Sequence, residues 1–258
     1  DGEESLLLIN PLIYGLAIYQ PILEPLCQEF RIITLDPRGM GASDRLVRPY
    51  QLTQHVEDLL AVIEASEIRQ VTAVGISRGS AFLVQLAAHH PGLLKSIILV
   101  GPSVPLSGME DQMRTLVEQP ENAEALKSGN LEGLIRRFAG TVFTEPGTES
   151  LKERQAKFVA SLPVETVTSF FLDREDDEKV GELLPLVKTP ALVIQGTEDQ
   201  RVSHELGREV ANRIPNALFY SMEGKGHLPM ATGRAEFCEV LRQFVMTGTM
   251  PEPQKARG

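Results

Sequence analysis

The stretch "AVGISRGSA" (residues 73–81) places Ser77 between two glycines, directly after a short apolar run. The apolar run predicts a β-strand and the residues after Ser77 predict a helix, so the serine lies at a strand-to-helix turn. Such a turn brings two backbones close together, and side chains in place of Gly75 and Gly79 would clash there. Two interpretations are open at this point: Ser77 is a reactive nucleophile, or it caps the helix in a glycine-rich turn.

Short apolar runs alternate with helical patterns along the chain, which predicts an α/β fold with a mostly parallel sheet flanked by helices. The expected strands span residues 6–9, 31–35, 71–74, 96–100, 191–194 and 217–221. Helices are expected to begin near Thr53, at Ser77 and after Ser203, which has the character of an N-cap. A last amphipathic helix carries Phe237, Val240, Leu241, Phe244 and Val245.

The alternation breaks between Pro105 and Lys188, where helical patterns and scattered phenylalanines replace the strands. A loop of that length in a compact domain is unusual without structure of its own, so we expect a helical insertion over the ends of the strands. The acidic cluster "DREDDEK" (173–179) has no fixed ligand spacing. It therefore predicts a solvated surface rather than a metal site.

Three further motifs follow expected strands. "LDPRGMGASDR" (35–45) comes after the second strand, "QGTEDQRV" (195–202) after the fifth and "GKGHLPM" (224–230) after the sixth. Taken in order with the turn at Ser77, they resemble the α/β-hydrolase superfamily over essentially the whole chain apart from its tail.

The resemblance implies an α/β-hydrolase fold with a helical cap inserted after the sixth strand of the family fold. It divides the chain into a core formed by residues 1–104 and 189–247, a cap or lid formed by residues 105–188, and a flexible tail formed by residues 248–258.

The resemblance also implies a catalytic triad in which Ser77 is the nucleophile, His227 the general base and Asp199 the acid. The chemistry of these groups fits those roles. A serine hydroxyl is nearly inert at neutral pH and needs a base within hydrogen-bond reach. Histidine, with an ordinary pKa of about 6.5, can take and return a proton near pH 7. A buried carboxylate then holds the imidazole in one tautomer and stabilises its charged form.

The other histidines and nearby carboxylates are given no catalytic role. His89 and His90 lie at an expected helix end, and His55 is expected on the polar side of its helix. The family spacing favours Asp199 over its neighbour Glu198. The residues also set aside are His204, which follows the expected N-cap, and Asp36 and Asp44, which are expected to form turns and arginine pairs.

One stretch departs from the family pattern. The first strand of the family usually runs into His-Gly, whereas this chain has Asn10-Pro11. Pro11 has no N–H, but the residue expected to donate to the oxyanion is Leu12, which keeps its own. The second expected donor is the backbone N–H of Arg78. The side chain of Arg78 has two interpretations: it pairs with a carboxylate of the 36–44 loop, or it binds a polar group of the substrate.

The composition limits the partners. A net charge of −10 argues against nucleic acid or an anionic membrane as the main partner. We expect no metal and no cofactor, and we expect Cys27 and Cys238 to be buried free thiols. No apolar stretch reaches transmembrane length. The sequence starts at Asp1 without methionine, so we expect residues upstream, and cytoplasmic is the default localisation.

The motifs predict a serine hydrolase that cleaves a small carboxylic ester, thioester or lactone through an acyl-enzyme. The alternative is a ligand-binding or regulatory α/β-hydrolase-like domain of a larger protein, with little or no hydrolytic activity. Transferases and other triad enzymes share the fold, which does not determine the chemistry. The nucleophile position holds serine, which argues against the dehalogenase and epoxide-hydrolase branches, where it is aspartate. The sequence leaves the substrate and the oligomeric state open.

Overall fold

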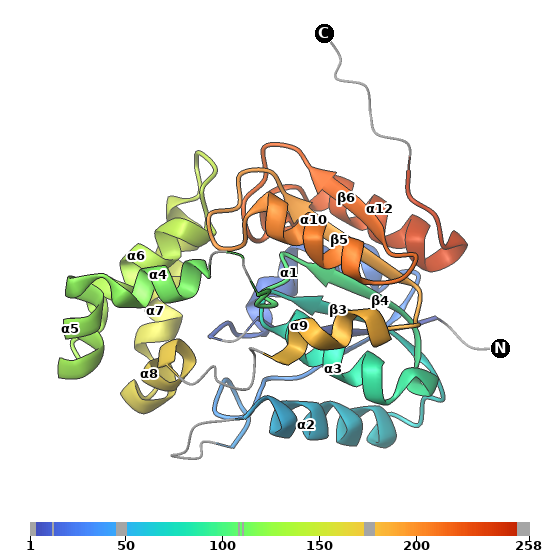
Figure 1. Ribbon diagram of the computed structural model, residues 1–258, viewed down its shortest axis with the longest axis horizontal. Helices are drawn as coiled ribbons and strands as arrows, with labels where there is room; N and C mark the ends of the chain where they lie inside the picture. The colour runs from blue at the N-terminus through green and yellow to red at the C-terminus, as the bar shows by residue number, and fades with distance from the viewer. Residues whose placement is uncertain are drawn as a thin grey trace, which may run out of the picture.

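The computed structural model describes residues 4–11, 13–44, 51–107, 109, 111–172 and 179–251 (Figure 1). Within these residues the strands form one six-stranded sheet with the order β2-β1-β3-β4-β5-β6, and every neighbouring pair is parallel. The strands are β1 (Ser5–Ile9), β2 (Arg31–Thr34), β3 (Val71–Ile76), β4 (Leu94–Val100), β5 (Ala191–Gly196) and β6 (Leu218–Met222).

All six expected strands are present, with ends that differ from the expected ones by at most two residues. The side chains of β1, β3 and β5 are buried along their whole length, whereas the edge strands β2 and β6 are only partly buried. Central strands of a parallel sheet are covered on both faces, which explains why their sequences are almost continuously apolar. The predicted α/β class and mostly parallel sheet are confirmed.

Helices cover both faces of the sheet (Figure 1). One group contains α1 (Gln20–Leu26), α11 (Pro229–Thr232) and α12 (Arg234–Thr247), which contact one another. The other contains α2 (Leu52–Ala65), α3 (Gly79–His89) and α9 (Val180–Leu183), with α3 in contact with both neighbours. Helix α10 (His204–Arg213) packs on β5 and β6. The expected N-cap of α10 is correct, since Ser203 Oγ accepts the Leu206 N–H at 3.1 Å.

Between β4 and β5 the chain forms the expected helical insertion, which stands to one side of the sheet (Figure 1). Its helices are α4 (Gln112–Glu118), α5 (Pro120–Ser128), α6 (Glu132–Val142), α7 (Glu149–Ala160) and α8 (Val164–Leu172). Phe138, Phe170 and Phe171 pack edge to face, with ring centroids 4.9 to 5.7 Å apart. These rings give the insertion an apolar centre of its own. The boundaries at 105 and 188 and the flexible tail stay predictions, and residues 173–178 of the acidic cluster lie outside the described residues.

Two expectations about single residues are wrong. His55 is buried, because Phe82 of α3 packs on it with the two rings stacked at 4.5 Å. The buried face of α2 is therefore wider than its apolar stripe. Cys27 is exposed, because it stands just past the end of α1, whereas Cys238 is buried as expected. Both cysteines are free thiols.

The burial of His55 makes stability depend on pH. Burial, helped by the positive charges of Arg78 and Arg38, lowers the pKa of His55 to about 3. The unfolded chain, with an ordinary histidine pKa of about 6.5, binds this proton more readily than the folded protein does. Stability from neutral His55 is therefore present above about pH 6.5 and is lost as the pH falls toward 3.

We expect the free energy of unfolding to fall by about 2 kcal/mol more in the wild type than in His55→Phe when the pH drops from 7 to 5. Phenylalanine keeps the ring stack but has no proton to bind. Urea denaturation at both pH values measures the difference. His89→Phe is the control, because His89 is exposed, and it should keep the wild-type pH dependence. Equal losses in the wild type and His55→Phe would contradict the prediction.

Candidate active site

Ser77 occupies a strained turn between β3 and α3. Its φ is +54°, a conformation that residues other than glycine rarely adopt. A Cβ on Gly75 would come within 2.7 Å of the Gly79 carbonyl oxygen, and a Cβ on Gly79 within 2.8 Å of the Ile9 carbonyl oxygen. The Ser77 N–H donates to Val100 O at 2.8 Å, which ties the turn to β4. The two glycines have the close backbone contacts that the sequence predicts, and the helix begins only at Gly79.

His227 and Asp199 lie beside Ser77, although they are far from it in the chain. His227 Nε2 is 2.9 Å from Ser77 Oγ, and His227 Nδ1 is 2.8 Å from Asp199 Oδ2. Both residues are buried. An ionised carboxylate can only accept, so the Nδ1–H donates to Asp199 and Nε2 is left to accept the Ser77 hydroxyl proton. The structure thus brings together the three residues that the sequence singled out.

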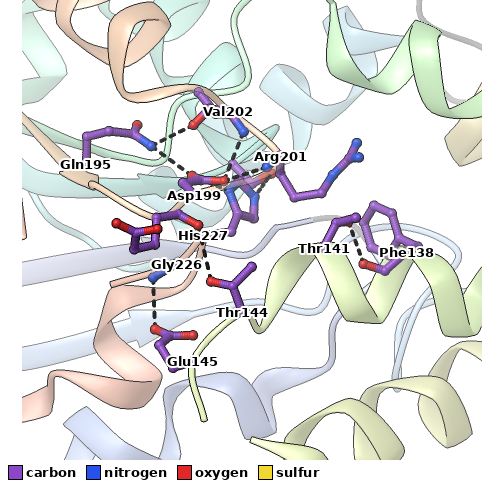
Figure 2. Close-up of polar contacts among 12 residues, drawn as sticks. Phe138, Thr141, Thr144, Glu145, Gln195, Asp199, Arg201, Val202, Gly226 and His227 are labelled. Atoms are coloured by element: carbon purple, nitrogen blue, oxygen red, sulfur yellow. Dashed lines mark hydrogen bonds and ion pairs between the residues drawn. The ribbon is translucent and has the colours of Figure 1, made fainter. Parts of the chain in front are cut away.

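The Asp199 carboxylate accepts hydrogen bonds from four donors, and Figure 2 shows how they converge on it. Oδ1 accepts the backbone N–H groups of Arg201 at 2.7 Å and Val202 at 2.9 Å. Oδ2 accepts Gln195 Nε2 at 2.8 Å in addition to His227. These donors stabilise the charged carboxylate in a buried place and fix its orientation.

Gln195 is a site residue that the sequence patterns did not predict. It is completely buried at the end of β5, and its Nε2 also donates to Val202 O at 2.9 Å. The signal that could have found it is a polar side chain at the end of an otherwise apolar strand, four residues before Asp199.

The loop that carries His227 is attached to the helical insertion (Figure 2). Glu145 Oε1, just beyond α6, accepts the Gly226 N–H at 2.8 Å and the Thr232 hydroxyl at 2.5 Å. The His227 N–H donates to Val142 O at 3.3 Å. The insertion therefore helps to position the histidine. No local pattern links Glu145 with a loop 81 residues further along the chain, so this contact could not be predicted.

A cavity of about 50 Å³ opens beside Ser77 and His227, between the sheet and the insertion. Phe138 and Phe170 contribute to its walls from α6 and α8. Its other lining residues include Val104, Pro105, Leu106, Met109, Met113, Val202 and Leu206. Two arginines, Arg78 and Arg201, also line it. The site is thus mostly apolar with a few polar groups, as is usual for small-molecule sites.

Only one of the two expected oxyanion donors lies within the described residues. Leu12 lies outside the described residues. Arg78 is the residue directly before α3, so the chain after Ser77 turns at once into the helix. Its role as a donor stays a prediction. Next to Leu12, Ile13 has a φ of +59°, rare for a β-branched residue, and its N–H lies 3.1 Å from Met40 Sδ.

The histidines and carboxylates that were given no catalytic role are exposed or bonded to other groups. His204 bonds Ser221 Oγ at 2.8 Å, and His89 and His90 are exposed. Asp36 Oδ2 accepts the Ala42 N–H at 3.0 Å, the expected turn role. The arginine of that loop, Arg38, pairs with Asp58 of α2. The remaining two are Glu198, whose N–H donates to Lys225 O, and Asp44, whose carbonyl accepts the Gly39 N–H.

The part of the chain that the structure describes contains no group of three or more His, Cys, Asp or Glu side chains placed to hold a metal ion. None of its helices is long and apolar enough to cross a bilayer.

The close contacts at the turn predict an effect of Gly79→Ala on stability. The new Cβ would press on the backbone of β1 at Ile9 and Asn10, which cannot move aside without disturbing the sheet. We expect the free energy of unfolding to fall by about 1–3 kcal/mol. Gly92→Ala is the matched control, because nothing lies within 4 Å of its Cβ position. Urea denaturation compares them, and equal midpoints for the two variants would contradict the account of the turn.

Known proteins resemble this chain over nearly its whole length. RutD of Caulobacter vibrioides, which carries the name of a carbamate hydrolase, is 25% identical over 252 residues, covering 95% of this chain and 91% of its own. The enol-lactonase of Burkholderia xenovorans superposes with a TM-score of 0.83 at 22% identity, over 95% of this chain and 92% of the lactonase. The esterase EaEST of Exiguobacterium antarcticum has a TM-score of 0.83 at 20% identity, with the same coverage.

At these identities the two solved structures establish the fold alone. The family model described as "alpha/beta hydrolase fold" matches residues 5–233, which is most of the chain. The match includes the turn at Ser77, the loop of Asp199 and the loop of His227. The chain belongs to the α/β-hydrolase family.

Proposed function

We propose that this protein is a serine hydrolase that cleaves a small carboxylic ester, thioester or lactone through an acyl-enzyme. The observation that carries the proposal is the continuous chain of hydrogen bonds from Asp199 through His227 to Ser77, at 2.8 and 2.9 Å. A hydroxyl that donates to a neutral imidazole, itself held by a carboxylate, is the arrangement that activates a serine nucleophile.

In the first step, Ser77 Oγ attacks the substrate carbonyl carbon while its proton moves to His227 Nε2. The carbonyl oxygen becomes an oxyanion. We assign its stabilisation to the backbone N–H groups of Arg78 and Leu12, as the order of the motifs implies. Asp199, which accepts four hydrogen bonds in its buried place, holds the imidazole in one orientation and stabilises the imidazolium that forms.

In the second step, the carbon–oxygen or carbon–sulfur bond to the leaving group breaks, and His227 returns its proton to the departing atom. The acyl group is then bound to Ser77 Oγ. A water molecule gives a proton to His227 Nε2 and attacks the acyl carbon. When the second intermediate collapses, the bond between the acyl carbon and Ser77 Oγ breaks, His227 returns the proton to Ser77 Oγ, and the acid is released. No redox step and no additional reactant besides water is required.

The lining of the cavity and the names of the relatives support an acyl substrate with an apolar part. Many of the side chains around Ser77 are apolar, which suits the hydrocarbon part of such a substrate. The relatives named as an enol-lactonase, an esterase and a carbamate hydrolase favour substrates with an acyl carbon bonded to oxygen or nitrogen.

The competing function is a binding or regulatory domain that keeps the fold without the chemistry. The replacement of His-Gly by Asn10-Pro11 is the observation that favours it, since this loop leads to a proposed oxyanion donor. Such a domain would bind a ligand, but neither the wild type nor any of its variants would hydrolyse an ester.

We expect Ser77→Ala and His227→Ala each to lower kcat by roughly 10³-fold or more, because triad members act as a unit. For the same reason the double variant should be little worse than either single one. Hydrolysis of p-nitrophenyl esters of graded acyl length, with a thioester and a lactone, measures this. His89→Ala is the control, since His89 is exposed and outside the site, and it should keep wild-type turnover.

Wild-type-like turnover by either single variant would reject the assignment of that residue. Absence of turnover by the wild type on every ester, thioester and lactone would favour the binding domain instead.

A further inference from the structure

Another cavity, the junction cavity, lies between residues 14–18 of the core and α7 of the insertion. Residues 14–18 follow β1 and run into a short 3₁₀-helix, Leu16–Tyr19. The volume of the junction cavity is about 330 Å³, which falls within the range that is usual for small-molecule sites. None of its described lining residues also lines the cavity of Ser77 and His227.

The walls of the junction cavity are mostly apolar. The core and α7 meet closely beside it, since a Cβ on Gly15 would come within 3.0 Å of Phe158 Cε2. Leu16, at the edge of the cavity, is one of the large apolar side chains that stay exposed. The apolar lining residues are Leu16, Ala17, Ile18, Phe143, Leu151 and Phe158. Such walls favour the hydrocarbon part of a ligand, because apolar surface is then removed from water on both sides.

Two buried polar side chains, Gln155 of α7 and Tyr14, also line the junction cavity. Gln155 is 5% exposed and Tyr14 is 6% exposed. Among the described residues, neither the two amide atoms of Gln155 nor the Tyr14 hydroxyl has a hydrogen-bond partner of good geometry. Buried amides and hydroxyls are nearly always bonded, so three such atoms around one cavity indicate that a ligand supplies their partners.

The hydroxyl of Tyr14 is a donor as well as an acceptor. Burial raises its pKa well above the ordinary value, so it keeps its proton at neutral pH. The Gln155 amide opposes part of this rise, which places the amide next to the hydroxyl. A single bond between the two side chains would still leave one atom of the amide without a partner.

The charges of the described lining residues cancel. The lining holds one acidic side chain, Asp36, and one basic side chain, Arg154. Asp36 Oδ2 accepts the Ala42 N–H at 3.0 Å, whereas the buried Oδ1 has no hydrogen-bond partner among the described residues. An uncharged ligand therefore fits this lining better than an ion does, and Asp36 Oδ1 adds an acceptor that needs a donor from the ligand.

We propose that the junction cavity is a second ligand-binding site, which takes a small uncharged molecule with an apolar ring or chain and a primary amide group. The cavity offers two acceptors, Gln155 Oε1 and Asp36 Oδ1, and two donors, Gln155 Nε2 and the Tyr14 hydroxyl. A primary amide has two N–H donors and a carbonyl acceptor, whereas an alcohol has a single proton to donate. The inference goes beyond the hydrolase function, because it uses no residue of the proposed triad.

The experiment measures the affinity of the wild-type protein for three probes of nearly equal shape. Benzamide has an apolar ring and a primary amide. Acetophenone replaces the NH₂ group with a methyl group and keeps only the acceptor, and benzoate replaces the amide with a charged carboxylate. Titration calorimetry or ligand-observed NMR gives each dissociation constant. We expect benzamide to bind roughly 10-fold more tightly than either of the other two, as the loss of one or more hydrogen bonds to buried groups predicts.

Two variants locate the bound benzamide. Gln155→Leu removes the amide at similar size, and it should weaken benzamide binding by roughly 10-fold, to about the affinity of acetophenone. Ala17→Phe places a ring in the junction cavity from an exposed position on its wall, so it should abolish binding without disturbing the core. Ala123→Phe is the matched control. Ala123 is exposed on α5, outside the lining, so this variant should keep the wild-type affinity.

Equal affinities of the wild type for the three probes, or no measurable binding of benzamide, would overturn the inference. So would wild-type affinity for benzamide in Ala17→Phe or in folded Gln155→Leu, since the probe would then be bound elsewhere, as in the cavity of Ser77. Circular dichroism shows whether Gln155→Leu is folded, and if it is not, Ala17→Phe alone decides. Hydrolysis of p-nitrophenyl esters tests the proposed function separately, so either proposal can fail without the other.

Discussion

The backbone of Ser77 is the constraint on which the site depends. A φ of +54° at a residue with a side chain stores strain, and the surrounding structure must hold it there. The missing side chains of Gly75 and Gly79 allow β3, α3 and β1 to approach to contact distance. The neighbouring strand β4 then binds the Ser77 N–H. The hydroxyl can reach His227 Nε2 only because this turn points it out of the end of the sheet.

The other side of the site depends on contacts between parts of the chain that are far apart. His227 is held by Asp199 through its ring and by Val142 of the insertion through its backbone. Glu145 binds the preceding Gly226 and Thr232 in the same region. A movement of the insertion would therefore disturb the histidine as well as the cavity, so in this protein the insertion both lines the site and helps to position its base.

Local patterns were sufficient for the strands and for the turn at Ser77, because burial on both faces of a parallel sheet makes each central strand apolar in itself. The N-cap at Ser203 was predictable because a capping serine bonds a backbone N–H of its own helix, only a few residues further along the chain. Ser77, Asp199 and His227 were found through motifs, each of which directly follows a strand. His55 and Cys27 were wrongly placed, because the position of Phe82 and the last turn of α1 decide their exposure. Gln195 contacts Asp199 only four residues further along the chain, so its polar side chain at the end of an apolar strand was a local signal. Glu145 acts through a tertiary contact 81 residues along the chain, which no spacing in the sequence encodes.

The central claim is that Ser77 is a nucleophile activated by His227. Treatment with a fluorophosphonate, followed by peptide mapping in a mass spectrometer, tests it without knowledge of the substrate. The account predicts one phosphonyl group per chain, on the peptide that contains Ser77, and a much slower reaction in a variant without the His227 imidazole. A wild-type protein that stays unlabelled, or one labelled at a different residue, would contradict it.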